Sequence, residues 1–214
     1  DTARIIAEIK RASPSKGLIR EDFPVVQLAR DLQAAGAAAL SVLTEKHYFR
    51  GSMRYLRIVR NNVNIPLLCK DFMVDAYQLY EARAFGADAV LLIASVLPPR
   101  AFQRLYEEAC DLGLAVLAEI HDEAELETVL AAGAQVVGVN SRDLRTFETD
   151  LGLAEKLLEK IPETVVKVAE SGIHQTKDIQ QLQKAGADAF LIGESIMRAT
   201  VPGKALKDLL AKPK

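Results

Sequence analysis

Four stretches of this chain end a helix-like segment in Gly-Ala and continue at once into a short apolar run. Their glycines lie about 50 residues apart, at Gly36, Gly86, Gly133 and Gly186. Glycine ends a helix by adopting a left-handed conformation that other residues resist, and a buried parallel strand reads as a short apolar run. A spacing of about 50 residues corresponds to two strand–helix units. Four such double units predict eight strands and eight helices, which form a single (β/α)8 TIM barrel.

The chain can be divided throughout into strands that alternate with helices, without a low-complexity linker. We expect strands at residues 4–10, 38–43, 66–72, 89–94, 114–120, 135–140, 164–171 and 189–193. The expected helices are residues 24–35, 52–62, 76–85, 100–112, 123–132, 151–161, 177–185 and 203–212, with a helical turn at 195–199. Because this barrel needs at least about 200 residues, residues 1–214 are predicted to be one domain.

Composition narrows the class of protein. The sequence is 50% hydrophobic and 26% charged with a net charge of −2, and it has no basic block or membrane-spanning run. Nucleic-acid and membrane partners are therefore not expected. The chain begins Asp-Thr-Ala-Arg, without an initiator Met or signal peptide, and we expect a processed fragment. Cys69 and Cys110 have no metal-ligand spacing, so both are expected to be buried and reduced in a cytoplasmic, monomeric enzyme.

Side-chain alternation identifies the residues that face the inside of the barrel. Alternate residues of a strand face the same side, so Glu8 and Lys10 share the interior side with Ile6, while Ile5, Ala7 and Ile9 face the helices. The same parity turns other polar side chains inward at the strand C-termini, where barrel active sites lie. The expected set is Glu8, Lys10, Lys70, Glu119, Asn140 and Glu170. The alternative is a structural network of compensating ion pairs that plugs the barrel.

A second group of residues is predicted to bind an anion. Gly172 follows the seventh strand, and Gly193, Glu194 and Ser195 follow the eighth strand at the start of a helical turn. The loops after strands 7 and 8 commonly hold phosphate through backbone N–H groups. If they do so here, the Glu194 carboxylate must point away from the phosphate. The alternative is that both glycines only form turns.

The histidines carry no metal-site signal. His47, His121 and His174 lie in polar loop stretches, and none has the spacing to a second ligand that a metal site requires. We therefore assign them no function and expect no metal.

Several longer motifs resemble one enzyme family. IIAEIKRASPSKG resembles the first-strand signature of indole-3-glycerol phosphate synthase, and LTEKHYFRGS, LLCKDFMVDAYQ, LAEIHDEAEL, VGVNSRDLRTFETD, VAESGI and FLIGESIMR are similar to its later motifs in the same order. The resemblance covers nearly the whole chain. It implies a ribulose-phosphate-binding barrel of tryptophan biosynthesis that closes the ring of 1-(2-carboxyphenylamino)-1-deoxyribulose 5-phosphate. Such a carboxy-lyase releases CO2 and water to give indole-3-glycerol phosphate, without metal or organic cofactor.

The resemblance also implies roles for individual residues. Lys70 matches the general acid for attack on the substrate carbonyl, and Lys10 matches a second lysine that binds the substrate carboxylate and assists a proton transfer. Glu119 matches the acid or base of the dehydration. The remaining mouth residues would orient these groups or line the mouth: Glu8, Asn140, Glu170 and Ser171.

Substrate-binding residues follow from the same motifs. An apolar wall for the anthranilate ring would consist of Phe49, Phe72, Leu91 and Ile93. The phosphate would meet Gly172, Gly193 and the residues after it, Glu194 and Ser195, with Ser13 and Arg142 nearby.

The sequence departs from the family pattern at its beginning, three residues before the first strand, where these enzymes normally carry an N-terminal extension over the mouth. We therefore expect a barrel that folds but captures substrate less well. The alternatives are a truncated or engineered barrel with little turnover, a non-catalytic phosphate-binding barrel, or another ribose-phosphate enzyme. The last class includes phosphoribosylanthranilate isomerase, which requires a Cys/Asp acid–base pair across the mouth. It also includes a Schiff-base aldolase that uses Lys70 or Lys10.

Overall fold

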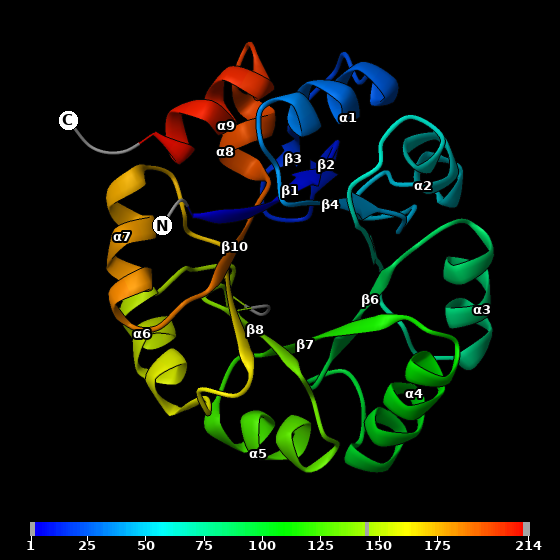
Figure 1. The fold of residues 1–214 in the computed structure, drawn as a ribbon, viewed down its shortest axis with the longest axis vertical. Helices are drawn as coiled ribbons and strands as arrows, with labels where there is room; N and C mark the ends of the chain where they lie inside the picture. The colour runs from blue at the N-terminus through cyan, green and yellow to red at the C-terminus, as the bar shows by residue number, and fades with distance from the viewer. Residues whose placement is uncertain (1–2, 144–145, 212–214) are drawn as a thin grey trace.

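The computed structural model describes residues 3–143 and 146–211, and within them eight parallel strands form a closed barrel (Figure 1). Around the barrel the strands follow the order β1, β10, β9, β8, β7, β6, β5, β4. Their bounds are β1 Arg4–Ile9, β4 Ala39–Leu43, β5 Leu67–Lys70, β6 Ala89–Ile93, β7 Ala115–Ile120, β8 Val136–Asn140, β9 Val166–Glu170 and β10 Ala189–Ile192. The predicted fold class is therefore confirmed.

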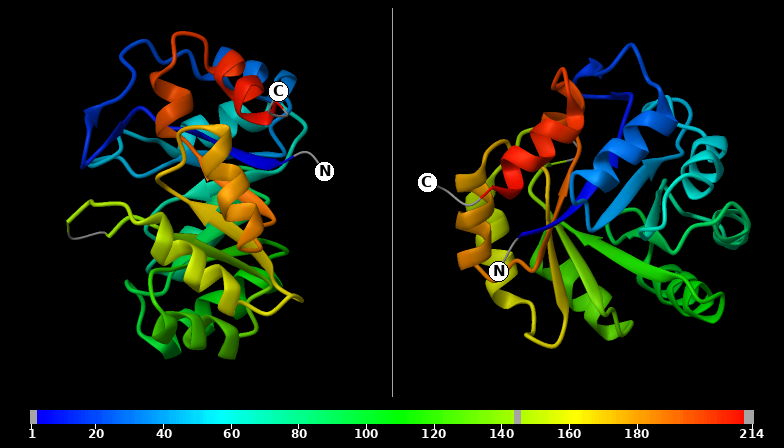
Figure 2. Two further views of the ribbon diagram at one scale, coloured as in Figure 1. Left: turned by 90° about the vertical axis from the view of Figure 1, so that its left-hand side faces the viewer. Right: turned by 45° about the horizontal axis from the view of Figure 1, so that its top comes forward.

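A ring of helices surrounds the strands (Figures 1 and 2). The helices are α1 Val25–Ala34, α2 Met53–Arg60, α3 Ala76–Ala84, α4 Pro99–Asp111, α5 Glu123–Ala131, α6 Leu151–Lys160, α7 Thr176–Lys184, α8 Glu194–Arg198 and α9 Pro202–Leu210. The strand from the start of the chain pairs with the strand near its end, Ile5 opposite Phe190, and α1 packs beside α9 over this seam. No helix of the described residues is long and apolar enough to cross a membrane.

The four Gly-Ala junctions have the backbone conformation that the sequence predicts. Gly36, Gly86, Gly133 and Gly186 have φ of 101°, 97°, 83° and 99°, which lie in the left-handed region. The N–H of each following alanine returns to a carbonyl of the preceding helix, as from Ala37 to Leu32. Each glycine therefore ends its helix and starts the next strand.

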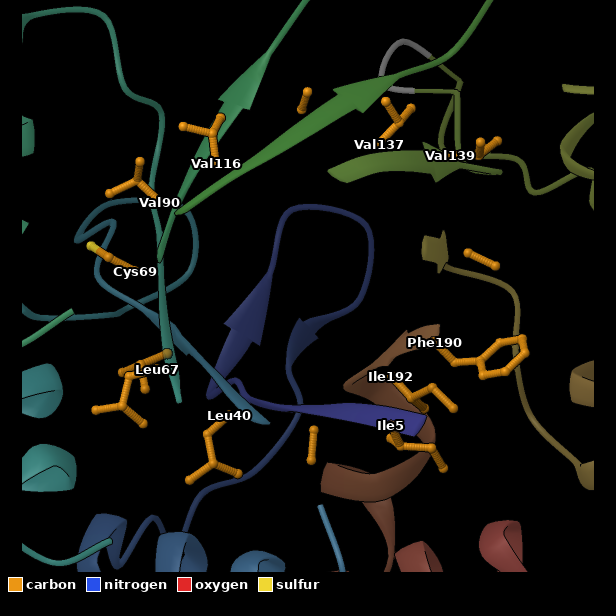
Figure 3. Close-up of a cluster of buried hydrophobic side chains, with 14 of the residues drawn as sticks. Ile5, Leu40, Leu67, Cys69, Val90, Val116, Val137, Val139, Phe190 and Ile192 are labelled. Carbon is orange, nitrogen blue, oxygen red and sulfur yellow. The ribbon is translucent and has the colours of Figure 1, made fainter. Parts of the chain in front are cut away.

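Strand alternation separates two apolar layers. Outward-facing side chains such as Ile5, Cys69 and Phe190 pack against the helices (Figure 3). A smaller apolar cluster lies inside the barrel and consists of Leu68, Leu91, Ile93, Leu117, Val168, Ala189 and Leu191. The inward-facing residues near the strand C-termini include two buried carboxylates, Glu8 and Glu119. The prediction from strand alternation that Glu8 and Glu119 face the inside of the barrel is therefore correct.

Some local features differ from the sequence prediction. Residues after β1 form a small hairpin, β2 Ala12–Ser13 and β3 Gly17–Leu18, whose two-residue strands leave no periodic pattern. The predicted burial of Cys110 is wrong, because this side chain is exposed. The buried stripe of α4 runs through Phe102, Leu105, Tyr106 and Ala109, and position 110 falls beside it. The predicted last helix reaches residue 212, which lies outside the described residues.

Candidate active site

The strand C-termini surround a cavity of about 420 Å³, a size suited to a small organic substrate. Polar and apolar side chains from β1, β4, β5, β6, β7, β8 and β10 line it together with the loops that follow the strands. All but one of the predicted site residues are at its wall: Glu8, Lys10, Ser13, Phe49, Lys70, Phe72, Leu91, Ile93, Glu119, Asn140, Arg142, Ser171, Gly172, Gly193, Glu194 and Ser195. Glu170 is the exception and lies behind this wall.

Lys70 is the centre of the charged cluster. Its Nζ lies 2.8 Å from Glu170 Oε2, 3.7 Å from Glu8 Oε2 and 3.8 Å from Glu119 Oε2. Burial lowers the pKa of Lys70, but the three carboxylates outweigh this effect and hold the pKa above its ordinary value. The side chain therefore carries a proton at neutral pH and can only donate hydrogen bonds.

Glu8 joins the two lysines. Its Oε1 lies 2.7 Å from Lys10 Nζ, while its Oε2 faces Lys70. Burial raises the pKa of the Glu8 carboxyl, but the two ammonium groups outweigh burial and lower the pKa below its ordinary value. Glu8 is therefore an anion that fixes the separation of two cations at the mouth.

Glu119 has two different oxygens. Its Oε1 accepts a hydrogen bond of 3.0 Å from Asn140 Nδ2, and its Oε2 faces Lys70. Asn140 is fixed in turn because its Oδ1 accepts from the backbone N–H of Arg142 at 3.1 Å. One Glu119 oxygen is thus held by the scaffold, and the other is directed toward the lysine.

Glu170 is buried at the base of the cluster, and Gly138 makes room for it. A β-carbon at position 138 would collide with Glu170 Oε1, which has no hydrogen-bond partner among the described residues. Burial raises the pKa of Glu170 to about 7 against the opposing charge of Lys70, and the Glu119 carboxylate adds to the rise. The Glu170 carboxyl therefore titrates near neutral pH.

One side of the cavity is apolar. The rings of Phe49 and Phe72 lie with centroids 6.2 Å apart, and Leu91 and Ile93 rise from β6 on the same wall. Leu43, Tyr48, Phe147, Ile173, Leu191 and Ile192, which sequence reasoning did not identify, also line the cavity.

A carboxylate organises the loop that carries Phe49. The Glu45 side chain accepts hydrogen bonds from the backbone N–H groups of His47, Tyr48 and Phe49 at 2.7, 2.6 and 2.9 Å. Partial burial raises the pKa of Glu45, but these donors outweigh it and lower the pKa below its ordinary value. The aromatic wall therefore depends on an ionised side chain outside the charged cluster.

The turns after β9 and β10 form the other end of the cavity. Ser171 and Gly172 both have left-handed backbone, with φ of 65° and 70°. A non-glycine residue in this conformation is strained, and such strain is concentrated at functional sites. The Ser195 hydroxyl donates to the carbonyl of Ile173 at 3.1 Å, which ties the two turns together.

Glu194 is held by arginines at this end. Its carboxylate lies 3.1 Å from Arg198 Nε and 3.6 Å from Arg142 Nη2. Burial raises the pKa of Glu194, but Arg198, Lys16 and Arg142 together outweigh it and lower the pKa. Glu194 is thus an anion in a region where the sequence predicts a phosphate.

His121, to which the sequence analysis assigned no function, lies beside Glu119. Its Nε2 lies 3.5 Å from Glu119 Oε1, and its Nδ1 lies 3.3 Å from Glu125 Oε2. The signal was present in the sequence, because residue 121 shares the interior parity of residues 117 and 119. Elsewhere, no group of three His, Cys, Asp or Glu side chains among the described residues is arranged to hold a metal ion.

The sequence matches known proteins over nearly its whole length. The family model described as "Indole-3-glycerol phosphate synthase" matches residues 1–209. A protein of that name from Campylobacter jejuni subsp. doylei is 50% identical over 207 residues, which are 97% of this chain and 80% of the relative. The Aliarcobacter butzleri protein of that name is 51% identical over 98% of this chain and 78% of the relative, and the Chromobacterium violaceum protein is 49% identical over 97% and 78%.

Solved structures resemble the fold at low sequence identity. Thiamine phosphate pyrophosphorylase from Pyrococcus furiosus has a TM-score of 0.71 and 19% identity, covering 97% of this chain and 93% of that chain. A structure titled KGPDC, from Streptococcus mutans, has a TM-score of 0.72 and 13% identity, covering 98% and 96%. At this identity the similarity supports the barrel fold alone.

Proposed function

The chain belongs to the indole-3-glycerol phosphate synthase family, and we propose that it carries out the family reaction at the mouth of its barrel. The substrate would be 1-(2-carboxyphenylamino)-1-deoxyribulose 5-phosphate. An aromatic carbon attacks the ketone carbon, CO2 leaves the ring, and water is eliminated to give indole-3-glycerol phosphate. The enzyme would therefore be a carbon–carbon lyase of the carboxy-lyase class.

The observation that best supports this proposal is the position of Lys70 among three carboxylates at the cavity wall. A ketone oxygen gains negative charge as the aromatic carbon attacks, and a nearby ammonium group can give it a proton. Lys70 is protonated at neutral pH because Glu170, Glu8 and Glu119 raise its pKa. A Schiff-base aldolase needs the opposite, a lysine with a lowered pKa.

The neighbouring side chains fit the later steps. Lys10 is placed by Glu8 and would bind the substrate carboxylate until CO2 leaves. In the dehydration the ring hydroxyl leaves as water and the adjacent carbon loses a proton, and Glu119 would carry this proton transfer. Asn140 orients the Glu119 carboxylate for this role. Ser171 would line the mouth beside them.

The two ends of the cavity suit the two ends of the substrate. Phe49, Phe72, Leu91 and Ile93 would contact the anthranilate ring. The phosphate would lie at the opposite end, at the backbone N–H groups of Gly172, Gly193, Glu194 and Ser195 with Ser13 and Arg142 nearby. A substrate with one apolar and one anionic end would therefore be held in a single orientation.

Steady-state kinetics on two variants test the proposal. Lys70→Ala should abolish formation of the fluorescent indole, and Glu119→Gln should lower kcat by about 10²-fold to 10⁴-fold with little change in substrate binding. Lys160→Ala is the matched control, since Lys160 is exposed on α6 and pairs only with Glu123 among the described residues. Near-parental kcat in Lys70→Ala would contradict the general-acid role. If the parent protein binds substrate but forms no indole, the proposal is wrong and the alternative of a barrel with little turnover holds.

A further inference from the structure

His121 is positioned beside Glu119 although it does not line the cavity. It follows directly after β7, and the strand parity that turns Glu119 inward also turns His121 to that side. The side chain is 17% exposed, and its Nε2 is fully buried 3.5 Å from Glu119 Oε1, without a hydrogen-bond partner among the described residues. A buried ring nitrogen thus faces a buried carboxylate.

The other ring nitrogen is held by the start of α5. Glu125 Oε2 accepts a hydrogen bond of 2.7 Å from the backbone N–H of His121 and lies 3.3 Å from its Nδ1. Glu125 is fixed in turn because its backbone N–H donates to the N-cap carboxylate of Asp122 at 2.9 Å. The first turn of α5 therefore sets the orientation of the imidazole ring.

The position of the ring between two carboxylates indicates its charge state. A neutral imidazole donates from one nitrogen only, whereas an imidazolium donates from both. Burial lowers the pKa of His121, but the hydrogen bond with Glu125 and the charges of Glu119, Glu125 and Glu170 outweigh burial and raise it. Two glutamates that face the ring from β7 and α5, and a third more distant on β9, thus favour its protonated form.

The charged groups at the mouth also favour the protonated form of His121. Glu8, Glu119 and Glu170 carry three potential negative charges, and Lys10 and Lys70 carry two positive charges. Glu125 beside the ring adds a fourth carboxylate, so an imidazolium at position 121 reduces the excess of negative charge. It also approaches the same Glu119 oxygen that Asn140 binds, which leaves Oε2 directed toward Lys70.

We propose that His121 is a positioning residue for Glu119: an imidazolium held by Glu125 serves as the counter-ion of the Glu119 carboxylate and leaves its Oε2 free for the reaction. The proposal rests on the proposed role of Glu119 in the dehydration. It makes the His121–Glu125 pair part of the proton-transfer apparatus of the site, although neither side chain touches the cavity.

Histidine titration by NMR tests the ion pair without any turnover. The chain has only His47, His121 and His174, so three labelled signals can be assigned by substitution. In the parent protein His121 should titrate above the ordinary histidine pKa, and its pKa should fall in both Glu119→Gln and Glu125→Gln while those of His47 and His174 stay unchanged. An identical His121 titration in all three proteins would overturn the proposal. Because each variant keeps the ring, the result does not depend on how well His121 itself can be replaced.

The pH profile of kcat tests the effect on the reaction. Loss of the imidazolium removes a positive charge from beside the Glu119 carboxylate, so the limb of the profile that disappears in Glu119→Gln should move to higher pH in His121→Gln. We expect kcat at neutral pH to fall about tenfold with KM nearly unchanged, which is less than the loss of a direct acid or base, and His121→Lys should restore part of the rate. A uniform loss of rate with an unmoved limb would indicate a purely structural role. If Glu119→Gln instead leaves kcat intact, the proposed role of Glu119 in the dehydration is wrong. The NMR titration still shows whether His121 and Glu119 form an ion pair.

Discussion

Glu8 occupies the space that a side chain at Gly193 would need. A β-carbon at position 193 would lie 2.5 Å from Glu8 Oε1 and 2.9 Å from Glu8 Cβ. Glu8 stands at the end of β1 and Gly193 directly after β10, which are neighbouring strands of the closed barrel. The glycine is therefore required by the buried carboxylate beside it, whatever ligand the turn binds.

Gly193→Ala should displace Glu8 and with it both lysines. Since the carboxylate is held by Lys10 at 2.7 Å, it cannot yield without moving a site residue, and a misplacement of about 1 Å can cost about 10²-fold in rate. We expect kcat/KM to fall by about that factor in a variant that still unfolds cooperatively. Gly152→Ala, at an exposed position of α6, is the control and should retain parental kinetics. Equal activity in the two variants would contradict the coupling.

The titration of Glu170 should make the stability of the protein depend on pH. Burial raises the pKa of Glu170 from 4.5 to about 7, so the native state binds this proton more tightly than the unfolded chain does. The resulting contribution to stability is complete below pH 4.5 and is lost as the pH rises through 7. Between pH 4.5 and 7.5 the parent should lose on the order of 3 kcal/mol of unfolding free energy that Glu170→Gln does not lose.

Urea unfolding at both pH values measures this difference. The exposed Glu127 on α5 provides the control, because Glu127→Gln should follow the parent at both pH values. Parallel stability curves for the parent and Glu170→Gln would show that Glu170 is ionised throughout this range.

Glu194→Gln should strengthen phosphate binding. The Glu194 carboxylate lies 3.6 Å from Arg142 Nη2, so it repels a phosphate at this end of the cavity and competes for the arginine. Removing one partly exposed charge should tighten the binding of inorganic phosphate about fivefold, measured by calorimetry. Arg142→Ala should weaken binding, and Glu123→Gln, at an exposed position of α5 that does not line the cavity, should leave it unchanged. Weaker binding in Glu194→Gln would mean that the carboxylate supports the site.

Glu45→Ala should impair substrate binding more than the chemical steps. The carboxylate holds three successive backbone N–H groups, including that of Phe49, and its loss would release the ring that packs against Phe72. We expect KM to rise about tenfold while kcat changes little, because the ring wall contacts substrate and transition state alike. Lys46→Ala, exposed on the same loop, is the control. A fall in kcat at unchanged KM would place the loop in the chemical steps.

The fold could be predicted because its signals are local. Gly36 and Gly186 end helices through a backbone conformation that glycine favours, and this requirement can be read from a few neighbouring residues. The inward placement of Glu8 and Glu119 follows from strand alternation once the strands are known. The same alternation correctly turned Cys69 toward the helices.

Other features depend on contacts between distant segments. The pairing of Glu194 with Arg142 joins the start of α8 to a loop more than fifty residues earlier, and no spacing rule relates them. His121 was missed for a different reason, since it was judged as a metal ligand and not as the partner of a carboxylate two residues earlier. Cys110 was misplaced because a residue at the edge of an amphipathic stripe is not resolved by periodicity alone.

The seam between β1 and β10 has a consequence for how activity arises during protein synthesis. A ribosome delivers Glu8 and Lys10 long before the turn at Gly193, yet Glu8 and Gly193 adjoin each other in the finished mouth. Contacts between such distant parts of a chain close late, after the entropy of a long loop has been overcome. A nascent chain that lacks β10 therefore contains Lys10 and Lys70 but no assembled site. The first indole fluorescence in a translation reaction would mark the time at which the ring of strands closes.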